Sequence, residues 1–269
     1  MNVANTCRFL ILTTLLLLAV IYAVETHILQ VAYREVVSSK LSSFFKDDVI
    51  VHITDLHITG LGWRETLLLE SIEDINPALI VMTGDYVEDT VNTDILLPFF
   101  QKLSGISTVI AIWGNNDYCG QEDIETIFNT CGIMILDNET VELYNGLDTC
   151  YIVGVGDNTN WHDNYYLAVK GLTASHRRIV LSHAPASIEM IDSTGVELIL
   201  SGHLHGGQIV LPLFGPLYDN RTSYVSDVYL EGFFGREGKI IYSNRGIGTS
   251  QIPLRFMSRP EIAVFRFIN

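Results

Sequence analysis

Basic residues are scarce in this chain. Its 269 residues include 16 Lys and Arg against 31 Asp and Glu, which gives a formal net charge of −15, and no run of Lys or Arg occurs. Nucleic acids and anionic membrane surfaces bind concentrated positive charge, so we expect neither to bind the chain's surface. Any phosphate that the chain handles would need bound cations to reverse the local field.

Cysteine and charge are sparse as well. The four cysteines (Cys7, Cys119, Cys131 and Cys150) show neither the paired spacing of a zinc site nor the density of a small disulfide-stabilised secreted protein. We interpret them as buried free thiols, which fits a reducing compartment. Only 17% of residues are charged and 48% are hydrophobic, which argues against disorder. The length suits one domain of about 220 residues behind an N-terminal segment.

One long apolar run lies near the N-terminus. Phe9–Val24 contains no charge and is bracketed by Arg8 and Glu25. It is slightly shorter than the ~20 residues that span a bilayer comfortably. We predict that residues 1–28 form a retained membrane anchor, a single span. The alternative is a signal peptide cut after Ala23, for which Ile21 is a poor small-residue partner.

A strand–helix rhythm follows the anchor. Residues 29–48 are predicted to form a juxtamembrane edge strand and then, from Ser38, a polar connector. Residues 49–269 are predicted to form an α/β domain. Its first half should contain strands at Val49–Thr54, Ala78–Met82 and Thr108–Ile112, separated by helices at Arg64–Ile75, Thr93–Leu103 and Gln121–Asn129. Its second half should contain strands at Thr149–Val155, Arg178–Ser182, Val196–Leu200, Gln208–Leu211, Lys239–Ser243 and Glu261–Phe267, with short helices near Tyr165–Val169 and Ala186–Ile191.

Five polar motifs each follow an apolar strand. The carboxyl edge of an open α/β sheet is where ligands bind, so these motifs should meet at one rim. Any one histidine is ordinarily structural, and we interpret the four outside the motifs (His27, His52, His162 and His176) in that way. Taken together, the carboxylates, imidazoles and amide of the motifs could hold two divalent metal ions, and such mixed ligands favour Mn, Fe, Zn or Co over Ca. The motifs are Asp55-Leu-His57, Gly84-Asp85, Gly114-Asn115-Asn116-Asp117, Ser182-His183 and Gly202-His203-Leu-His205.

In this order the motifs resemble those of the metallophosphoesterase, or calcineurin-like, family. The resemblance runs from about Val49 to the C-terminus, and the segments Ser201–Gln208 and Arg245–Ser250 resemble the family's bacterial membrane-anchored branch. It implies a four-layer α/β/β/α sandwich of two mixed sheets. It also implies that two metals, with Mn favoured, lower the pKa of a shared water so that hydroxide attacks phosphorus. By resemblance, one metal is held by Asp55, His57, Asp85 and His205, and the other by Asp85, Asn115, His183 and His203, with Asp85 bridging.

The chain departs from the family at Asn116, where the family usually has a histidine that helps to protonate the leaving oxygen. An asparagine cannot act as a general acid. Asp117, which would orient that histidine, then loses its usual partner. Either the protein is a non-catalytic scaffold, or its leaving group needs no proton. We favour the second interpretation, with Asn116 and Asp117 in the catalytic site, because a phosphate can leave a pyrophosphate without a general acid.

Combined with the anchor, this departure favours a membrane-tethered enzyme that cleaves the pyrophosphate bond of a lipid-linked nucleotide. The family resemblance then suggests UDP-2,3-diacylglucosamine, a lipid A precursor, as that substrate, and it would place the domain in the cytoplasm. The alternative is a broad phosphodiesterase or phosphatase of the cell envelope. Arg221 and Arg245 are candidate contacts for substrate phosphate. The sequence leaves the oligomeric state open.

Two further apolar features permit more than one interpretation. Trp63 and Trp161 could flank the cleft, although we expect them to be buried in packing contacts. The apolar segment Leu211–Leu217 could meet a membrane or pack against the core.

Overall fold

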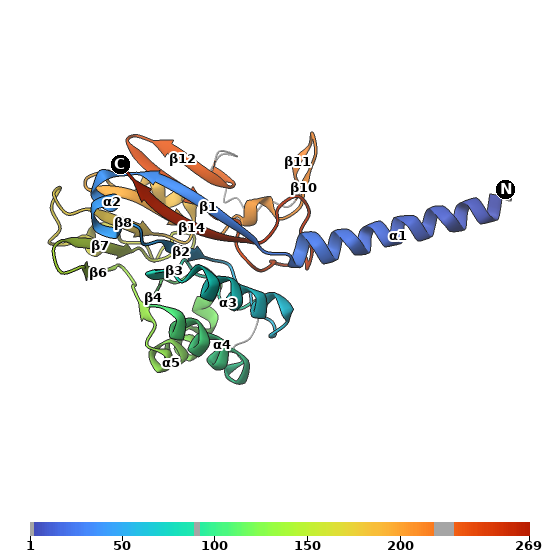
Figure 1. Cartoon of the computed structure of the whole chain (residues 1–269), viewed down its shortest axis with the longest axis horizontal. Coiled ribbons are helices and arrows are strands. Elements are labelled where there is room, and N and C mark those ends of the chain that lie inside the picture. Colours follow the sequence, from blue (N-terminus) through green and yellow to red (C-terminus); the bar gives the residue numbers. More distant parts are fainter. Residues whose placement is uncertain (1–2, 89–91, 218–228) are drawn as a thin grey trace.

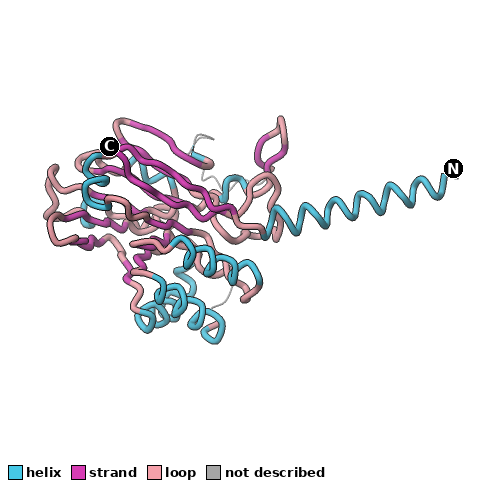
Figure 2. The backbone as a smooth tube through the Cα atoms, in the orientation of Figure 1, coloured by secondary structure: helices cyan, strands magenta, loops and turns pink. Residues whose placement is uncertain are grey.

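The computed structural model describes residues 3–88, 92–217 and 229–269. Helix α1 (Val3–His27) projects from the domain as a long rod, and the remaining elements form the compact body from which it emerges (Figure 1). Figure 2 shows that this rod is helical throughout and stands apart from the strands. Residues Asn5–His27 are long and apolar enough to cross a membrane, a property that a signal sequence near an N-terminus shares.

Two six-stranded mixed sheets form the centre of the domain. The first has the order β1-β14-β2-β3-β4-β5, in which the β14–β2 pair is antiparallel and the other pairs are parallel. Its strands are β1 (Gln30–Val37), β14 (Glu261–Ile268), β2 (Ile50–Ile53), β3 (Leu79–Met82), β4 (Val109–Ala111) and β5 (Met134–Ile135).

The second sheet has the order β12-β13-β9-β8-β7-β6, with antiparallel pairs at both edges and parallel pairs between them. Its strands are β12 (Gly232–Arg236), β13 (Lys239–Ser243), β9 (Val196–Ser201), β8 (Arg178–Leu181), β7 (Thr149–Gly154) and β6 (Glu139–Tyr144).

Helices cover the outer faces of both sheets. A buried apolar layer joins the two sheets, and a second one joins the first sheet to α3 (Trp63–Ile75), α4 (Thr93–Ile106) and α5 (Gln121–Cys131). A third, smaller one lies under α6 (Tyr165–Ala168) and the 3₁₀ helix η2 (Pro185–Glu189). The predicted α/β sandwich of two mixed sheets flanked by helices is confirmed.

The central strands explain why the polar motifs meet. β2, β3, β4 and β8 consist almost entirely of aliphatic residues and are buried on both faces, as parallel strands between two layers must be. In the first sheet Ile53 pairs with Met82, and Met82 pairs with Ala111. In the second sheet Leu181 pairs with Leu200. Neighbouring strands therefore end at the same level, and the loops that follow them share one rim.

Residues 29–48 belong to the folded body. β1 is an edge strand, as predicted, and pairs with β14 along its whole length. The predicted polar connector from Ser38 is wrong, because this stretch forms helix α2 (Ser39–Phe45), capped by the Ser38 hydroxyl. Leu41, Phe44 and Phe45 lie on one helical face at i, i+3 and i+4, and they are buried in the layer between the sheets. The domain limits set from the sequence stay predictions.

The segment Leu211–Leu217 does not pack against the core. It forms the hairpin β10 (Val210–Leu211) and β11 (Gly215–Pro216), whose tip residues Leu213 and Phe214 are 102% and 85% exposed. Burial was also wrong for the two tryptophans, since Trp63 is 52% and Trp161 is 90% exposed. It was wrong for two of the four cysteines as well, since Cys7 and Cys119 are exposed, whereas Cys150 is buried. The short 3₁₀ helices η1 (Asp117–Gly120) and η3 (His205–Gly207) complete the described elements.

Candidate metal centre

The seven predicted ligands converge on the rim where the central strands end. Asp55 and His57 follow β2, Asp85 follows β3, and Asn115 follows β4. From the second sheet, His183 follows β8, and His203 and His205 follow β9. All are buried except Asn115, which is partly exposed. Side chains from two sheets thus meet in one buried cluster.

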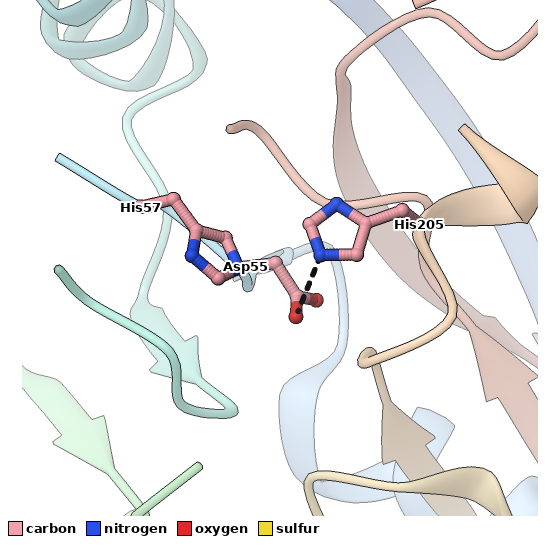
Figure 3. A group of neighbouring side chains, drawn as sticks. All are labelled: Asp55, His57 and His205. Carbon is pink, nitrogen blue, oxygen red and sulfur yellow. Dashed lines mark ion pairs between the residues drawn. The ribbon is translucent and has the colours of Figure 1, made fainter. Parts of the chain in front are cut away.

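Two groups within this cluster have metal-binding geometry. The ligand atoms of Asp55, His57 and His205 all lie within 4.8 Å of one another, and so do those of Asp85, His183 and His203. Figure 3 shows the Asp55 carboxylate between the two imidazoles of its group, with His205 Nε2 3.6 Å from Asp55 Oδ1. Each group therefore offers one carboxylate and two imidazoles to a cation.

Asp85 lies between the two groups. Its Oδ2 is 3.5 Å from Nε2 of His183 in its own group and 3.6 Å from Nε2 of His57 in the other group. Asn115 joins the second group, because its Oδ1 lies 2.9 Å from His183 Nε2. This arrangement is the one in which a single carboxylate could be shared between two cations.

The backbone of the ligand loops is strained. Five of the seven candidates have positive φ, a conformation that costs a non-glycine residue roughly 1–2 kcal/mol. These five are Asp55 (49°), His57 (41°), Asp85 (56°), His203 (70°) and His205 (51°). Strain of this kind concentrates at functional sites, and here it turns successive side chains into the same cluster.

Two glycines allow the strained loops to approach one another. A Cβ on Gly114 would collide with the Asp85 carboxylate and backbone, and a Cβ on Gly202 would collide with Thr54 and with Asp55 Oδ2. Glycine at these positions therefore sets the close packing of loops from different strands.

The carboxylates and imidazoles of the cluster shift one another's pKa values. Burial opposes ionisation of Asp55, yet the imidazoles of His205, His183 and His57 lower the pKa of this carboxyl to about 2. Burial also opposes protonation of His183, but the carboxylates of Asp85 and Asp55 raise its pKa to about 9. The carboxylates thus hold positive charge in a buried place, and a cation that binds there would displace the imidazole proton.

Unsatisfied ring nitrogens support the fit of a metal. Within the residues that the structure describes, His57 Nε2 is buried and has no hydrogen-bond partner. It faces Asp85 Oδ2 at 3.6 Å, close enough for one ion to contact both atoms. A buried imidazole nitrogen without a partner is rare in folded proteins, and metal coordination would satisfy it.

Three neighbours that the sequence did not reveal orient the imidazoles. Glu88 Oε2 lies 2.5 Å from Nδ1 of His57, and the Thr83 carbonyl accepts from Nδ1 of His183 at 2.7 Å. Arg255 Nη2 lies 3.2 Å from Nδ1 of His205. In each case Nε2 is directed to the cluster. The Nδ1 atoms of His57 and His183 face oxygen acceptors, as in metal-binding histidines, whereas Nδ1 of His205 faces a guanidinium that can only donate, so this nitrogen accepts.

Arg255 is a buried residue that connects several loops near the candidate metal centre. It is fully buried, and its guanidinium donates to the backbone carbonyls of Gly248, Ser258 and His205. Its own backbone N–H donates to Thr26 Oγ1 at the end of α1, at 3.0 Å. Arg255 therefore connects the last turn of α1 to a candidate ligand. Nothing in its sequence context marks it, since its partners are carbonyls that only the fold brings together.

Asn116 and Asp117 both contact the Asp85 loop. The Asn116 backbone N–H and side-chain Nδ2 donate to the two Asp85 carboxylate oxygens at 2.9 and 3.0 Å. Asp117 accepts the backbone N–H groups of Asp85, Tyr86 and Gly114 at 2.7–2.8 Å. Burial and the nearby Asp85 raise the pKa of Asp117 to about 7. Asp117 thus positions backbone, and the catalytic roles of both residues stay predictions.

Of the two arginines predicted to bind substrate, the structure describes only Arg245. Arg245 is occupied by Glu261 (3.2 Å), Glu231 (3.5 Å) and Gln30 (2.9 Å), so its guanidinium is committed to structural contacts. Arg221 lies outside the described residues. Substrate binding by either residue stays a prediction.

Comparison with known proteins agrees with this geometry. Residues 49–207 match the family model described as calcineurin-like phosphoesterase, which covers the ligand loops of both sheets. The chain belongs to the calcineurin-like phosphoesterase family. Members use divalent metals, and the two groups described above are the candidate sites in this chain. The protein is a metal-dependent phosphoester hydrolase.

Several bacterial relatives of this phosphoesterase align along most of its length. The chain is 31% identical over 250 residues to the uncharacterized metallophosphoesterase YkuE of Bacillus subtilis, covering 90% of this chain and 86% of that protein. It is 35% identical over 216 residues to the uncharacterized protein YpbG of the same organism, covering 79% and 78%. It is 29% identical over 259 residues to the phosphodiesterase YaeI of Escherichia coli, covering 90% and 91%.

Proposed function

We propose that this phosphoesterase is anchored in a membrane, binds two divalent metal ions that share Asp85, and hydrolyses a diphosphate bond in a lipid-linked nucleotide. The observation that carries the proposal is the position of Asp85 Oδ2, 3.5 Å from His183 Nε2 and 3.6 Å from His57 Nε2. A carboxylate placed in this way fits a site for two ions roughly 3.5–4 Å apart.

The residues divide into two ligand sets around Asp85. Asp55, His57 and His205 would complete one set, and Asn115, His183 and His203 the other. Ions held there would supply an activated water and neutralise charge on the phosphoryl group. The mixed nitrogen and oxygen donors fit Mn, Fe, Zn or Co, and we favour Mn.

Asn116 supports a substrate with a good leaving group. Its amide reaches the Asp85 carboxylate and so lies at the edge of the site, where it can donate a hydrogen bond to bound phosphate. It has no proton to give at neutral pH. General acid catalysis raises a reaction rate about 10²–10⁴-fold. Without a general acid, hydrolysis of an alkyl ester would lose this rate enhancement, whereas hydrolysis of a diphosphate would lose far less.

The anchor supports a substrate at the membrane. α1 is free of charge from Phe9 to Val24, and its inner end is tied to the domain by an ion pair between Glu25 and Arg259 at 2.8 Å. An enzyme tethered in this way works at a high local concentration of lipid-linked substrates. UDP-2,3-diacylglucosamine has the required diphosphate, nucleotide and lipid, and it places the domain on the cytoplasmic side.

A broad phosphodiesterase of the cell envelope is the second candidate. The relative YaeI carries the name phosphodiesterase and aligns with nearly the whole chain. A non-catalytic scaffold on the same fold is the third. The three candidates differ in the bond that they cleave, so substrate profiling separates them.

The test uses the full-length protein in detergent micelles, loaded with Mn. We expect about two metal ions per chain by elemental analysis and release of UMP from UDP-2,3-diacylglucosamine. The Asp85→Ala variant should lose metal and more than about 100-fold of the turnover, because even removal of a group that orients a ligand costs 10–100-fold. Asp47→Ala is the matched control, since the Asp47 side chain is 96% exposed.

The outcomes discriminate among the candidates. Turnover of bis(p-nitrophenyl) phosphate without UMP release would favour the broad phosphodiesterase over the hydrolase of a lipid-linked nucleotide. Bound metal without turnover of any substrate would favour the scaffold. An Asp85→Ala variant that keeps full metal content and turnover would overturn the shared-carboxylate site itself.

A further inference from the structure

A large cavity connects the inner end of α1 with the candidate metal centre. Its volume is about 1100 Å³, above the range of roughly 300–1,000 Å³ that is usual for small-molecule pockets. α1 contributes Tyr22 and Ala23 to its wall, the segment before and at the start of α3 contributes Leu61 and Trp63, and the metal centre contributes His57 with its partner Glu88.

The two ends of this cavity differ in chemistry. His57 and Glu88 line the cavity at the metal end, next to Asp85, and Arg64 and Glu65, which pair with each other at 2.7 Å, are further charged residues of its wall. At the α1 end, large apolar side chains are open to solvent: Tyr22 is 46%, Leu61 is 48% and Trp63 is 52% exposed. Adjacent apolar surface left exposed beside a pocket marks a binding surface more often than a structural one.

The α1 wall is held in place by the domain. Thr26 is 2% exposed and accepts the backbone N–H of Arg255, which also contacts His205. The His27 ring lies edge-on to the Trp63 ring, with centroids 6.4 Å apart. The last turns of α1 are therefore a fixed part of the cavity.

The position of the cavity relative to a bilayer follows from α1. The apolar part of the helix extends to Val24, so Tyr22 and Ala23 stand where the span meets the membrane surface. The apolar tip of the β10–β11 hairpin, Leu213 and Phe214, lies on the same side of the domain as α1 (Figure 1). The Val210 N–H donates to the Phe256 carbonyl at 2.9 Å, and Phe256 adjoins Met257, which binds Glu25 of α1.

We propose that this cavity binds the apolar chain of a membrane phospho-amphiphile, with α1 as one wall, while the phosphate reaches the metal centre past His57. The inference rests on the proposed hydrolase function and adds to it the site that recognises the lipid. α1 is then a part of the substrate site as well as an anchor. The substrate is taken from the bilayer that α1 crosses, because the open apolar end of the cavity faces that bilayer.

The first test fills the cavity from the α1 side. Ala23→Trp places a large ring in the cavity, and Ala19→Trp, one turn back on the same helix and outside the cavity, is the matched control. Full-length variants are assayed with UDP-2,3-diacylglucosamine in mixed micelles and with soluble bis(p-nitrophenyl) phosphate. We expect Ala23→Trp to lower kcat/KM for the lipid at least 10-fold and to leave the soluble ester unchanged, and Ala19→Trp to change neither.

A second variant guards against misfolding. Trp63→Ser removes an exposed wall residue instead of adding bulk. It should also lower turnover of the lipid and spare the soluble ester.

The second test measures binding without turnover. Metal-free full-length protein in phosphatidylcholine vesicles is irradiated with phosphatidic acid that carries a diazirine on its acyl chain, and the labelled peptides are identified by mass spectrometry. We expect labels in residues 60–65 and 249–253, which lie outside the apolar span, and loss of these labels in Ala23→Trp but not in Ala19→Trp.

The outcomes separate the two proposals. A wild-type protein that hydrolyses neither substrate, yet is labelled at residues 60–65, contradicts the proposed function and supports the lipid cavity. Labels confined to the span N-terminal to Tyr22, or an equal loss of both activities in Ala23→Trp and Trp63→Ser, overturn the cavity proposal and leave the hydrolase intact.

Discussion

Asp117 accepts the backbone N–H of Asp85 at 2.8 Å. The same carboxylate also accepts the N–H groups of Tyr86 and Gly114, so it ties the loop after β3 to the loop after β4. This contact fixes the backbone of the residue whose side chain faces both metal groups. In the family pattern an acid at this position would orient a histidine, and here it orients the loop that carries the Asp85 carboxylate.

Replacing Asp117 by asparagine tests this role. An asparagine offers one acceptor oxygen and turns its NH₂ toward a backbone donor, which leaves buried N–H groups without partners. Each such group costs about 1–3 kcal/mol, so we expect Asp117→Asn to lower the free energy of unfolding by about 2–4 kcal/mol in urea titrations. Metal content per chain should fall as well. Asp123→Asn, an exposed substitution on α5, is the control, and equal stability of the two variants would refute the positioning role.

Asn116→His tests the leaving-group interpretation. An imidazole beside the Asp85 carboxylate can donate a proton, so hydrolysis of an alkyl phosphodiester should rise by about 10-fold or more. Hydrolysis of bis(p-nitrophenyl) phosphate, whose leaving group needs no proton, should not rise, and diphosphate cleavage should fall. Steady-state kcat for the three substrates, compared with the exposed control Asn129→His, gives the answer. An equal change in kcat for all three substrates would contradict the leaving-group interpretation.

Arg255→Lys tests the brace behind His205. A lysine keeps the charge but cannot reproduce the planar fork that reaches the carbonyls of Gly248 and Ser258 together with His205. Carbonyls left buried without donors should lower the free energy of unfolding by about 3 kcal/mol. Because the backbone carbonyl of His205 loses its Arg255 donor, the His205 loop is held less firmly and Mn affinity should also fall about 10–100-fold, measured by titration. The exposed Arg266→Lys should change neither quantity, and unchanged Mn affinity in Arg255→Lys would show that the brace does not act on the ligand.

The sequence predicted the rim of the centre well, for a physical reason. Parallel strands between two layers need aliphatic residues on both faces, so β2, β3 and β8 stand out as apolar runs, and Asp55, Asp85 and His183 follow them within a few residues. The polarity change at each strand end is a local signal. Such a change can be recognised in the sequence without knowledge of the fold.

Features that depend on distant partners were missed. Five residues in the predicted metal site adopt positive φ where the loops pack on one another, a conformation that few non-glycine residues adopt and that no local sequence pattern marks. Helix α2 was interpreted as polar because three apolar residues in eleven look sparse until the inter-sheet layer covers them. The partly exposed edge strands β6 and β12 escaped prediction because polar residues in β6 and glycines in β12 interrupt their apolar residues.

His52 makes stability depend on pH in a predictable direction. It is fully buried on β2, its Nε2 lies 2.8 Å from Thr83 Oγ1, and burial lowers its pKa from 6.5 to about 3. The unfolded chain therefore takes up a proton at His52 below about pH 6.5 that the folded chain does not. This contribution to stability is complete above pH 6.5 and is lost as the pH falls toward 3. Between about pH 7.5 and about pH 5 the loss should be about 2 kcal/mol.

The variant His52→Gln isolates this effect, because glutamine can keep the contact with Thr83 and does not titrate. The metal-site histidines titrate in both proteins, so their effect cancels in the comparison. Urea denaturation of both proteins at the two pH values should show that the wild type loses about 2 kcal/mol more than the variant. An equal loss in both would mean that His52 is protonated in the folded state, and thus that the layer around β2 admits water.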